Sequence, residues 1–221
     1  MWRLKLRRWR WSRRVQLPPD IAAVWDAPLP GTSSSLRDLS FLVCDAEMSG
    51  LDPAQAELLS LGWVRVDGLE IALGTAGHHL IRNRRSVGQS AAIHQLRDCE
   101  LSAADDVSEV LHAFLKAARG CVLVFHNAAL DTAFLDRAAK RVFGTPLLLP
   151  TVDTLLLEQR LLQRQERPIG QGDLRLGACR DRYGLISHEA HNALADALAT
   201  AELLLAHVAR RGPDLTLRQL L

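Results

Sequence analysis

The sequence predicts an α/β fold with a mixed central β-sheet flanked by α-helices. Three apolar segments follow one another closely near the start of the domain, and Asp67-Gly68 marks a hairpin turn between the second and the third. After them, segments with a helical spacing of apolar residues alternate with one short buried strand. A meander of strands followed by alternating helix and strand is typical of a mixed sheet that helices cover.

The expected strands are apolar segments bounded by turn residues, and they cover residues 41–46, 56–66, 70–81 and 121–125. The expected helices follow the 3.6-residue period of apolar positions. They cover residues 102–120, 128–143, about 153–165, about 173–183 and about 193–210. Ser102 is the expected N-cap of the first of these helices, which stops at Gly120.

Length and composition predict a globular protein with one large domain. The chain has 221 residues, with 48% hydrophobic and 24% charged residues, which are ordinary values for a soluble protein. We expect a basic N-terminal arm and linker over residues 1–40, a folded domain over residues 41–212 and a short C-terminal tail over residues 213–221.

The cysteines and the apolar segments favour a cytoplasmic location. Cys44, Cys99, Cys121 and Cys179 are far apart and have no CxxC spacing, so we expect reduced thiols. No stretch approaches the roughly 18 to 20 apolar residues of a membrane-spanning helix. The N-terminus also lacks the apolar core of a signal peptide.

Charge is distributed unevenly along the chain. Residues 1–14 contain seven basic residues and no acid, whereas the other 207 residues contain 20 basic and 25 acidic ones. Trp2, Trp9 and Trp11 lie among the arginines. Such an arm could bind nucleic-acid phosphates, dock on the body or on a second copy of the chain in a homodimer, or lie on an anionic membrane. The membrane is the least favoured of these partners.

Two acids end the first expected strand. Asp45 and Glu47 are one residue apart, so both side chains point to the same face, about 6 to 7 Å apart along the backbone. Ending a buried strand with two unpaired carboxylates would be costly. The pair therefore predicts half of a chelating site.

Two more acids begin helices. Asp131 follows the strand 121–125 and lies in the first turn of the next helix. Asp196 lies in the first turn of the last helix, at the edge of its apolar face, and His191 precedes it by five residues. Each of these residues alone has an ordinary explanation as a helix cap or a surface side chain. Together with Asp45 and Glu47 they predict an active site.

The combined motifs resemble the DEDDh exonucleases of the ribonuclease H-like superfamily. The resemblance rests on D-x-E at Asp45 and Glu47, H-N-x-x-x-D at residues 126–131 and H-x-x-x-x-D at residues 191–196, in the order of that family. Segments around His94 and Asp153 also look like parts of the proofreading epsilon subunit of bacterial DNA polymerase III. The similarity spans about residues 41–208 and implies a ribonuclease H-like fold.

The resemblance implies a metal-dependent 3′-to-5′ exonuclease that releases nucleoside 5′-monophosphates from nucleic acid with a free 3′ end. Four converging carboxylates repel one another, and hard oxygen ligands suit two Mg²⁺ or Mn²⁺ ions. The family pattern assigns one ion to Asp45, Glu47 and Asp196 and the second to Asp45 and Asp131. His191 is the implied general base. Met48 and Ser49 are the implied contacts of the terminal nucleotide.

Departures from the family pattern keep alternatives open. Met48-Ser49-Gly50 stands where the epsilon subunit usually has Thr-Thr-Gly, and oligoribonucleases have a similar Glu-Met-Thr-Gly stretch. The epsilon-like segment at residues 126–129 favours DNA, in repair or proofreading, over an oligoribonuclease-like role in RNA turnover. A catalytically silent nucleic-acid-binding module and an endonuclease of the same superfamily are less favoured. Association with a DNA polymerase is left open.

Overall fold

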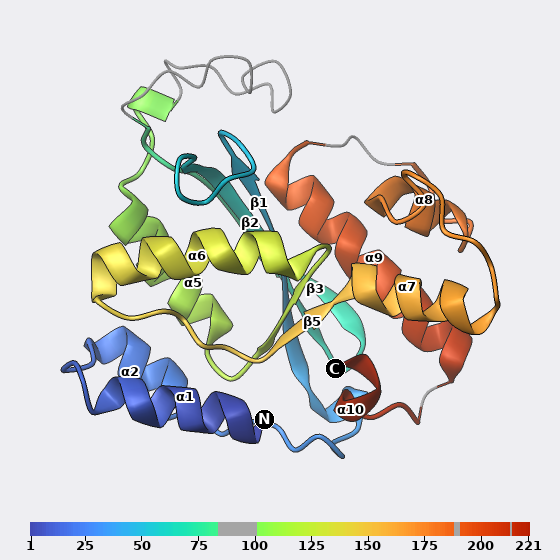
Figure 1. Ribbon diagram of the computed structural model, residues 1–221, viewed down its shortest axis with the longest axis horizontal. Coiled ribbons are helices and arrows are strands. Elements are labelled where there is room, and N and C mark those ends of the chain that lie inside the picture. Colours follow the sequence, from blue (N-terminus) through green and yellow to red (C-terminus); the bar gives the residue numbers. More distant parts are fainter. Residues whose placement is uncertain (84–100, 188–190, 213) are drawn as a thin grey trace.

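A five-stranded mixed sheet forms the centre of the protein in the computed structural model, which describes residues 1–83, 101–187, 191–212 and 214–221 (Figure 1). The strand order is β3-β2-β1-β4-β5. β1, β2 and β3 pair antiparallel, whereas β4 is parallel to β1 and β5 is parallel to β4. The predicted mixed sheet is therefore confirmed. The strands are β1 (Ser40–Met48), β2 (Leu58–Asp67), β3 (Glu70–Leu80), β4 (Val122–Phe125) and β5 (Thr151–Asp153).

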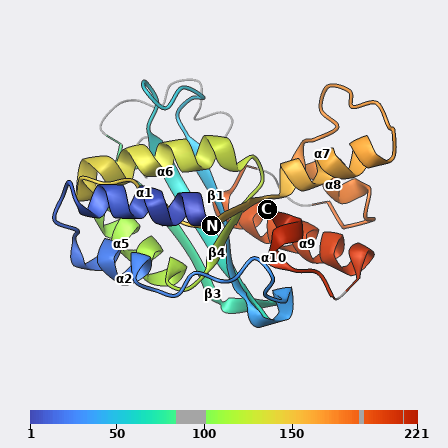
Figure 2. The same cartoon turned by 60° about the horizontal axis from the view of Figure 1, so that its bottom comes forward.

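Helices cover both faces of this sheet (Figures 1 and 2). One apolar cluster joins one face to α1 (Trp2–Ser12), α2 (Pro19–Trp25), α5 (Val107–Ala118) and α6 (Ala128–Phe143). A second cluster joins the other face to α7 (Thr154–Arg164), α9 (Ala193–Arg211) and α10 (Leu217–Leu220). The short helix α8 (Leu176–Asp181) packs beside α9.

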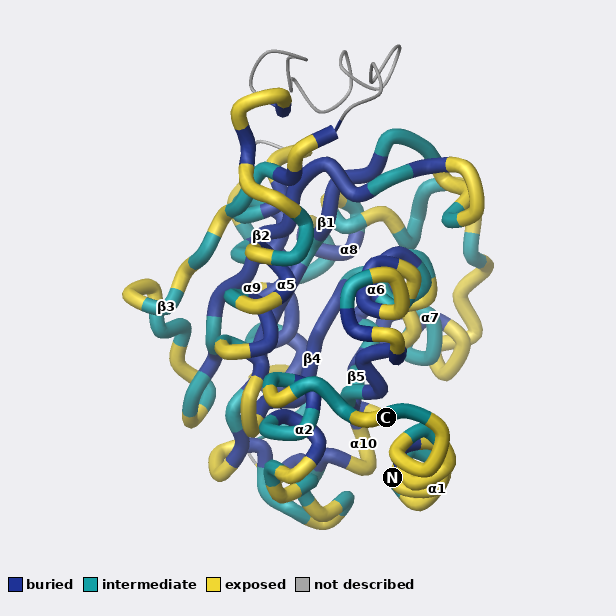
Figure 3. Tube along the Cα trace, turned by 90° about the vertical axis from the view of Figure 1, so that its left-hand side faces the viewer, coloured by how far each residue is buried: buried dark blue, intermediate teal, exposed yellow. Residues whose placement is uncertain are grey.

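The alternation along β1 decides which layer receives the acidic pair. Leu42, Cys44 and Ala46 belong to the cluster under α5 and α6, whereas Phe41 and Val43 belong to the cluster under α9. Because side chains alternate between faces, residues 45 and 47 continue the face of Phe41 and Val43. The central strands are buried along most of their length (Figure 3).

Most predicted elements are confirmed within three residues, and α5 begins five residues later than expected. The hairpin turn is found where it was expected. Gly68 and Leu69 both have positive φ, at 59° and 69°, as a two-residue hairpin loop requires. One predicted cap is wrong. The N-cap of α5 is Asp106, not Ser102, because the Asp106 side chain accepts from Ser108 N and Glu109 closes a capping box.

Several elements were not predicted. The short strand β5 ends at Asp153, where a helix was expected to begin, and α2 lies in a region that was expected to be arm and linker. Ile21, Val24 and Trp25 of α2 are buried in the core cluster under α5 and α6. The arm is therefore packed on the body through α2.

The segment before β1 and the chain end pair with each other. Leu217 N donates to Ser34 O at 3.1 Å, and Leu36 N donates to Leu215 O at 3.1 Å. Leu217 is fully buried. The expected domain boundaries at residues 40 and 212 stay predictions.

Two remaining expectations have different outcomes. Cys44, Cys121 and Cys179 are buried free thiols, whereas Cys99 and His94 lie outside the described residues. Among the helices described, none is long and apolar enough to cross a membrane.

Candidate active site

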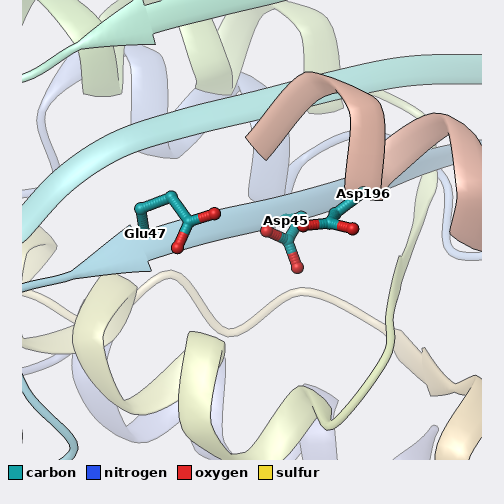
Figure 4. Close-up of side chains that lie close together, drawn as sticks. All are labelled: Asp45, Glu47 and Asp196. Atoms are coloured by element: carbon teal, nitrogen blue, oxygen red, sulfur yellow. The ribbon is translucent and has the colours of Figure 1, made fainter. Parts of the chain in front are cut away.

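Three of the predicted acids form one cluster. Oxygen atoms of Asp45, Glu47 and Asp196 all lie within 4.8 Å of one another. Figure 4 shows the two carboxylates of β1 and the Asp196 carboxylate of α9 grouped in the space between the strand and the helix. The strand parity and the helical position that the sequence predicted therefore bring these side chains together.

Gly62 allows α9 to begin beside Asp45. The two residues are paired across β1 and β2, so they share the face that α9 covers. A Cβ atom on Gly62 would lie 2.3 Å from the carbonyl carbon of Ala193 and 2.4 Å from the nitrogen of Leu194. Any larger residue would push the start of α9 away from the sheet, and Asp196 with it.

Burial and mutual repulsion make the Asp45 carboxylate hard to ionise. Burial is the largest cause of its raised pKa, and the charges of Asp131, Asp196 and Glu47 raise the pKa further. Among the described residues Asp45 has no salt-bridge partner. Ionised Asp45 therefore requires a cation in the cluster.

Asp131 lies next to the cluster and is not part of the group of three. It is 4% exposed in the first turn of α6. Hydrogen bonds from its own N–H and from Ala46 N–H stabilise its carboxylate, yet burial raises its pKa to about 8, and the charges of Asp153 and Glu47 act in the same direction. Asp131 is thus electrostatically connected to the acids of β1.

His191 and Asp196 are joined through the backbone. His191 has a φ of 71°, and its N–H donates to Asp196 Oδ2 at 2.9 Å. The Asn192 side chain accepts from Leu194 N and Ala195 N, both at 3.1 Å, and so caps α9. The side chain of His191 is exposed and lines the same cleft as Asp45 and Asp196.

The cleft beside the acids has a volume of about 1150 Å³. Its other walls come from the starts of α6 and α7 and from the segment 170–177 that leads into α8. Two arginines line it. Arg180 is 3% exposed, donates to Ala199 O and pairs with Glu202 at 2.7 Å. Arg175 is exposed and, among the described residues, has no acidic partner, so it can contact an anionic ligand.

Asp153 holds the starts of two helices at this cleft. Its Oδ1 accepts from Asn127 N and from Leu155 N, and its Oδ2 accepts from Ala128 N, all at 3.0 Å. One carboxylate therefore caps α6 in addition to α7, which it precedes in sequence. Because α6 carries Asp131, this carboxylate also fixes the position of an acid of the site.

His126 has a supporting role. Its Nδ1 lies 2.9 Å from Thr154 Oγ1 and its Nε2 lies 2.8 Å from Leu174 O. Both ring nitrogens are occupied, and burial lowers the pKa of the ring. The imidazole thus ties the α7 start to the segment that enters α8.

Met48 and Ser49 close the turn after β1. The Met48 side chain is 8% exposed in the core cluster. Ser49 N donates to Glu57 O at 2.9 Å, and Ser49 Oγ accepts from Glu57 N at 3.0 Å. These contacts fix the backbone beside Glu47. Contact of Met48 and Ser49 with a nucleotide stays a prediction.

The donor set fits a divalent cation. Carboxylate oxygens are the preferred ligands of Mg²⁺ and Mn²⁺, and three of them converge here from residues 45, 47 and 196. Burial raises the pKa of Asp45 and of the neighbouring Asp131, and the charges of nearby acids raise both further. A bound cation would remove that penalty.

Comparison with known protein families assigns the chain to one of them. A model of the RNase_T family, described as exonuclease, matches residues 42–204. The chain belongs to this exonuclease family. The ribonuclease H-like fold and the DEDDh motif set expected from the sequence agree with that membership. The roles of individual residues stay predictions.

Relatives of this exonuclease domain occur in larger proteins. The chain is 32% identical over 176 residues to a DNA polymerase III PolC-type of Thermotoga maritima, covering 79% of this chain and 12% of that protein. It is 35% identical over 175 residues to a DNA polymerase III subunit epsilon-like protein of Rhodobacter capsulatus, covering 77% and 24%. The chain thus spans less than a third of these relatives. The chain is 27% identical over 178 residues to a DNA polymerase III subunit epsilon of Treponema pallidum. The match covers 78% of this chain and 80% of that protein.

Solved structures show the same fold. Exonuclease I superposes with a TM-score of 0.68 at 17% identity, over 76% of this chain and 40% of that protein. Exonuclease I of E. coli in complex with a 5cy-dT13 oligonucleotide gives a TM-score of 0.66 at 17% identity, over 79% and 41%. The exonuclease domain thus has the architecture of exonuclease I.

Three positions that shape this site were not predicted from the sequence. Gly62 interrupts an apolar strand, which is a known sign of a close backbone approach, but only the structure shows that α9 is what approaches. Asp153 lies in a segment that only the family resemblance singles out, and its carboxylate accepts from Asn127 N, 26 positions away in the chain. Arg175 has no local signal, because its place in the cleft depends on the path from α7 to α8.

Proposed function

We propose that this protein is a metal-dependent 3′-to-5′ exonuclease that hydrolyses the terminal phosphodiester bond of DNA and releases nucleoside 5′-monophosphates. The observation that supports this most strongly is the cluster of Asp45, Glu47 and Asp196 at one side of a large cleft. Membership in the exonuclease family agrees with it.

The acids would hold two Mg²⁺ or Mn²⁺ ions. Asp45, Glu47 and Asp196 would hold one ion, and Asp45 with Asp131 would hold the other. When bound, such ions neutralise charge on the phosphoryl oxygens and lower the pKa of water. The protein contributes the fixed spacing of these carboxylates, which come from β1, α6 and α9.

His191 would act as the general base. Its side chain lines the cleft beside Asp45 and Asp196, and its backbone is held by the bond to Asp196 Oδ2. In this role an imidazole nitrogen takes the proton of the attacking water. Arg175 would bind a substrate phosphate, and Met48 and Ser49 would border the terminal nucleotide.

The preference for DNA is supported by the relatives, which are named as DNA polymerase III proteins. Those names also make association with a DNA polymerase part of the proposal. The alternative is an oligoribonuclease-like enzyme, which the sequence Glu47-Met48-Ser49-Gly50 favours. A silent binding module is disfavoured, because such a protein would have no need to retain all four acids.

Digestion of matched single-stranded DNA and RNA oligomers, labelled at the 5′ end, tests the proposal. With Mg²⁺ or Mn²⁺ we expect a ladder that shortens from the 3′ end, nucleoside 5′-monophosphates as products and a faster reaction on DNA. Excess EDTA should stop it. Cleavage of a circular single strand would indicate an endonuclease, and activity that persists in EDTA would contradict the proposal.

A further inference from the structure

The N-terminal helix α1 is fixed on the body by one side only. Arg8 is 7% exposed, and it donates through Nε to Leu148 O and through Nη1 to Trp25 O, both at 2.9 Å. Leu4 and Trp11 pack against the core cluster on the same side. The opposite side of the helix faces outward (Figure 3). α1 therefore presents a stable outer surface.

That outer surface is aromatic and strongly basic. Trp2 is 69% exposed and Trp9 is 54% exposed. The guanidinium of Arg3 lies 5.6 Å from the ring centroid of Trp2, and that of Arg13 lies 5.1 Å from that of Trp9. None of the exposed cations of this segment forms an ion pair with a described residue. They are Arg3, Lys5, Arg7, Arg10, Arg13 and Arg14.

A groove runs along the side of α1 that faces the body. It has a volume of about 380 Å³ and is lined by Leu4 and Arg7 of α1 at one end. Ala128 and Leu156 also line the groove. The residues just before them, Asn127 and Leu155, line the cleft. Neighbouring residues at the starts of α6 and α7 thus line the groove and the cleft, although no residue lines both, and the carboxylates of Asp136 and Asp153 also line the groove.

The path is short enough for a single strand to follow. α1 is bonded to Leu148 O, and the cleft begins at the helix starts that Asp153 caps. Five extended residues between these points span at most about 17 Å, at roughly 3.3 Å per residue. This corresponds to about five stacked nucleotides at roughly 3.4 Å each.

We propose that α1 is a second binding surface for the substrate, which holds the single strand upstream of the 3′ end while that end lies in the cleft. This inference rests on the proposed exonuclease function. Exposed indole rings beside cations are the combination that binds single strands through base stacking and phosphate contacts. The short distance along the chain between α1 and the cleft favours a nucleic acid over a lipid surface, because the strand whose 3′ end lies in the cleft would pass near these cations.

Two variants test the surface without disturbing its attachment to the body. Trp9→Ala removes one stacking platform, and we expect it to weaken binding of a long oligothymidylate by about 5- to 150-fold. Lys5→Ser/Arg10→Ser removes two cations, and we expect the slope of log affinity against log salt to become shallower by about 1.4. Binding is measured by fluorescence anisotropy of a labelled strand in EDTA, so that the substrate stays intact.

Matched controls lie at the far edge of the sheet. Arg37→Ser removes an exposed cation beside the β2–β3 turn, and Leu73→Ala removes a side chain on β3 that is 66% exposed. Both should leave affinity and salt slope unchanged. In Mg²⁺, the α1 variants should lower kcat/KM on the long strand and leave hydrolysis of a dinucleotide unchanged, because a dinucleotide cannot reach α1.

The other outcomes overturn the inference in distinct ways. If the α1 variants bind the long strand as tightly as wild type but lose binding to phosphatidylserine vesicles, α1 is a membrane-surface helix. If they bind the strand normally but break a dimer in sedimentation, α1 is a subunit contact. Absence of nucleotide release by the wild type would refute the proposed function alone, since the anisotropy measurement does not depend on catalysis.

Discussion

The Asp131 carboxylate keeps its proton at neutral pH while no cation lies beside it, because burial raises its pKa to about 8. In the unfolded chain its pKa is about 3.9. Between these values the folded state binds a proton that the unfolded state does not, so the stability of the metal-free protein falls as pH rises from about 4 to about 8.

A bound divalent cation should reverse this pH dependence. We expect the increase in Tm caused by saturating Mg²⁺ to be larger at about pH 8 than at about pH 6, because fewer protons then compete with the ion. Thermal unfolding in Mg²⁺ and in EDTA measures this difference. Asp131→Asn should reduce the pH dependence in EDTA, and an equal Mg²⁺ effect at both pH values would contradict the assignment of Asp131.

Substitutions at His191 and Asp196 should distinguish the proposed general base from a proposed metal ligand. Because His191 has a φ of 71°, Asn is the matched replacement, since it tolerates this conformation. We expect His191→Asn to lower kcat by about 10² to 10⁴ and to keep the Mg²⁺-induced rise in Tm. Asp196→Asn should lose both the activity and the Mg²⁺-induced rise in Tm. Unchanged activity of His191→Asn across the neutral pH range would exclude His191 as the base.

At the scale of elements, the site depends on how closely α9 approaches β2. Gly62→Ala would place a methyl group within 2.4 Å of the α9 backbone, so the helix start must move and carry Asp196 away from Asp45. We expect a loss of about 1 to 3 kcal/mol in stability, together with a loss of activity and of the Mg²⁺ effect on Tm.

Gly74→Ala is the control for that change. Gly74 also lies in the antiparallel part of the sheet, on β3, but its added Cβ would meet no atom within 4 Å. It should leave activity and the Mg²⁺ response unchanged. Equal activity of Gly62→Ala and Gly74→Ala would show that the close approach of α9 does not position the site.

The elements also show what local pattern can predict. The alternation in β1 and the apolar period of α9 are local properties, so they correctly placed Asp45, Glu47 and Asp196 on facing surfaces. β5 has three residues, too few for a periodic signal. The dual capping by Asp153 and the close approach at Gly62 depend on partners distant in sequence, which no local pattern contains.

At the scale of the whole molecule, one buried polar network joins α7, the end of α8 and α9. Glu158 of α7 is 1% exposed. Its Oε1 accepts from Tyr183 Oη at 2.6 Å and lies 3.3 Å from His207 Nδ1 of α9, and its Oε2 accepts from Arg182 at 3.1 Å. Burial alone would raise the Glu158 pKa, but these hydrogen bonds lower it overall.

Glu158→Gln should therefore destabilise the protein by about 3 to 5 kcal/mol, because it removes the charge of a fully buried carboxylate that accepts from the partly buried cation of Arg182. Urea unfolding measures this loss. Glu166→Gln, at an exposed position after the same helix, should have almost no effect. A loss below about 1 kcal/mol in Glu158→Gln would indicate that the helices are held by apolar packing alone.

The cluster of Asp45, Glu47 and Asp196 has a consequence for biosynthesis. Its first two members come from the first strand of the sheet and its third from the last long helix, so one ion would connect segments that emerge from the ribosome at different times. A nascent chain has no complete site until α9 has left the exit tunnel and packed on β1 and β2. The site would thus be inert while the segments from β1 to α9 are being synthesised, and its activity would begin only when α9 has packed on the sheet.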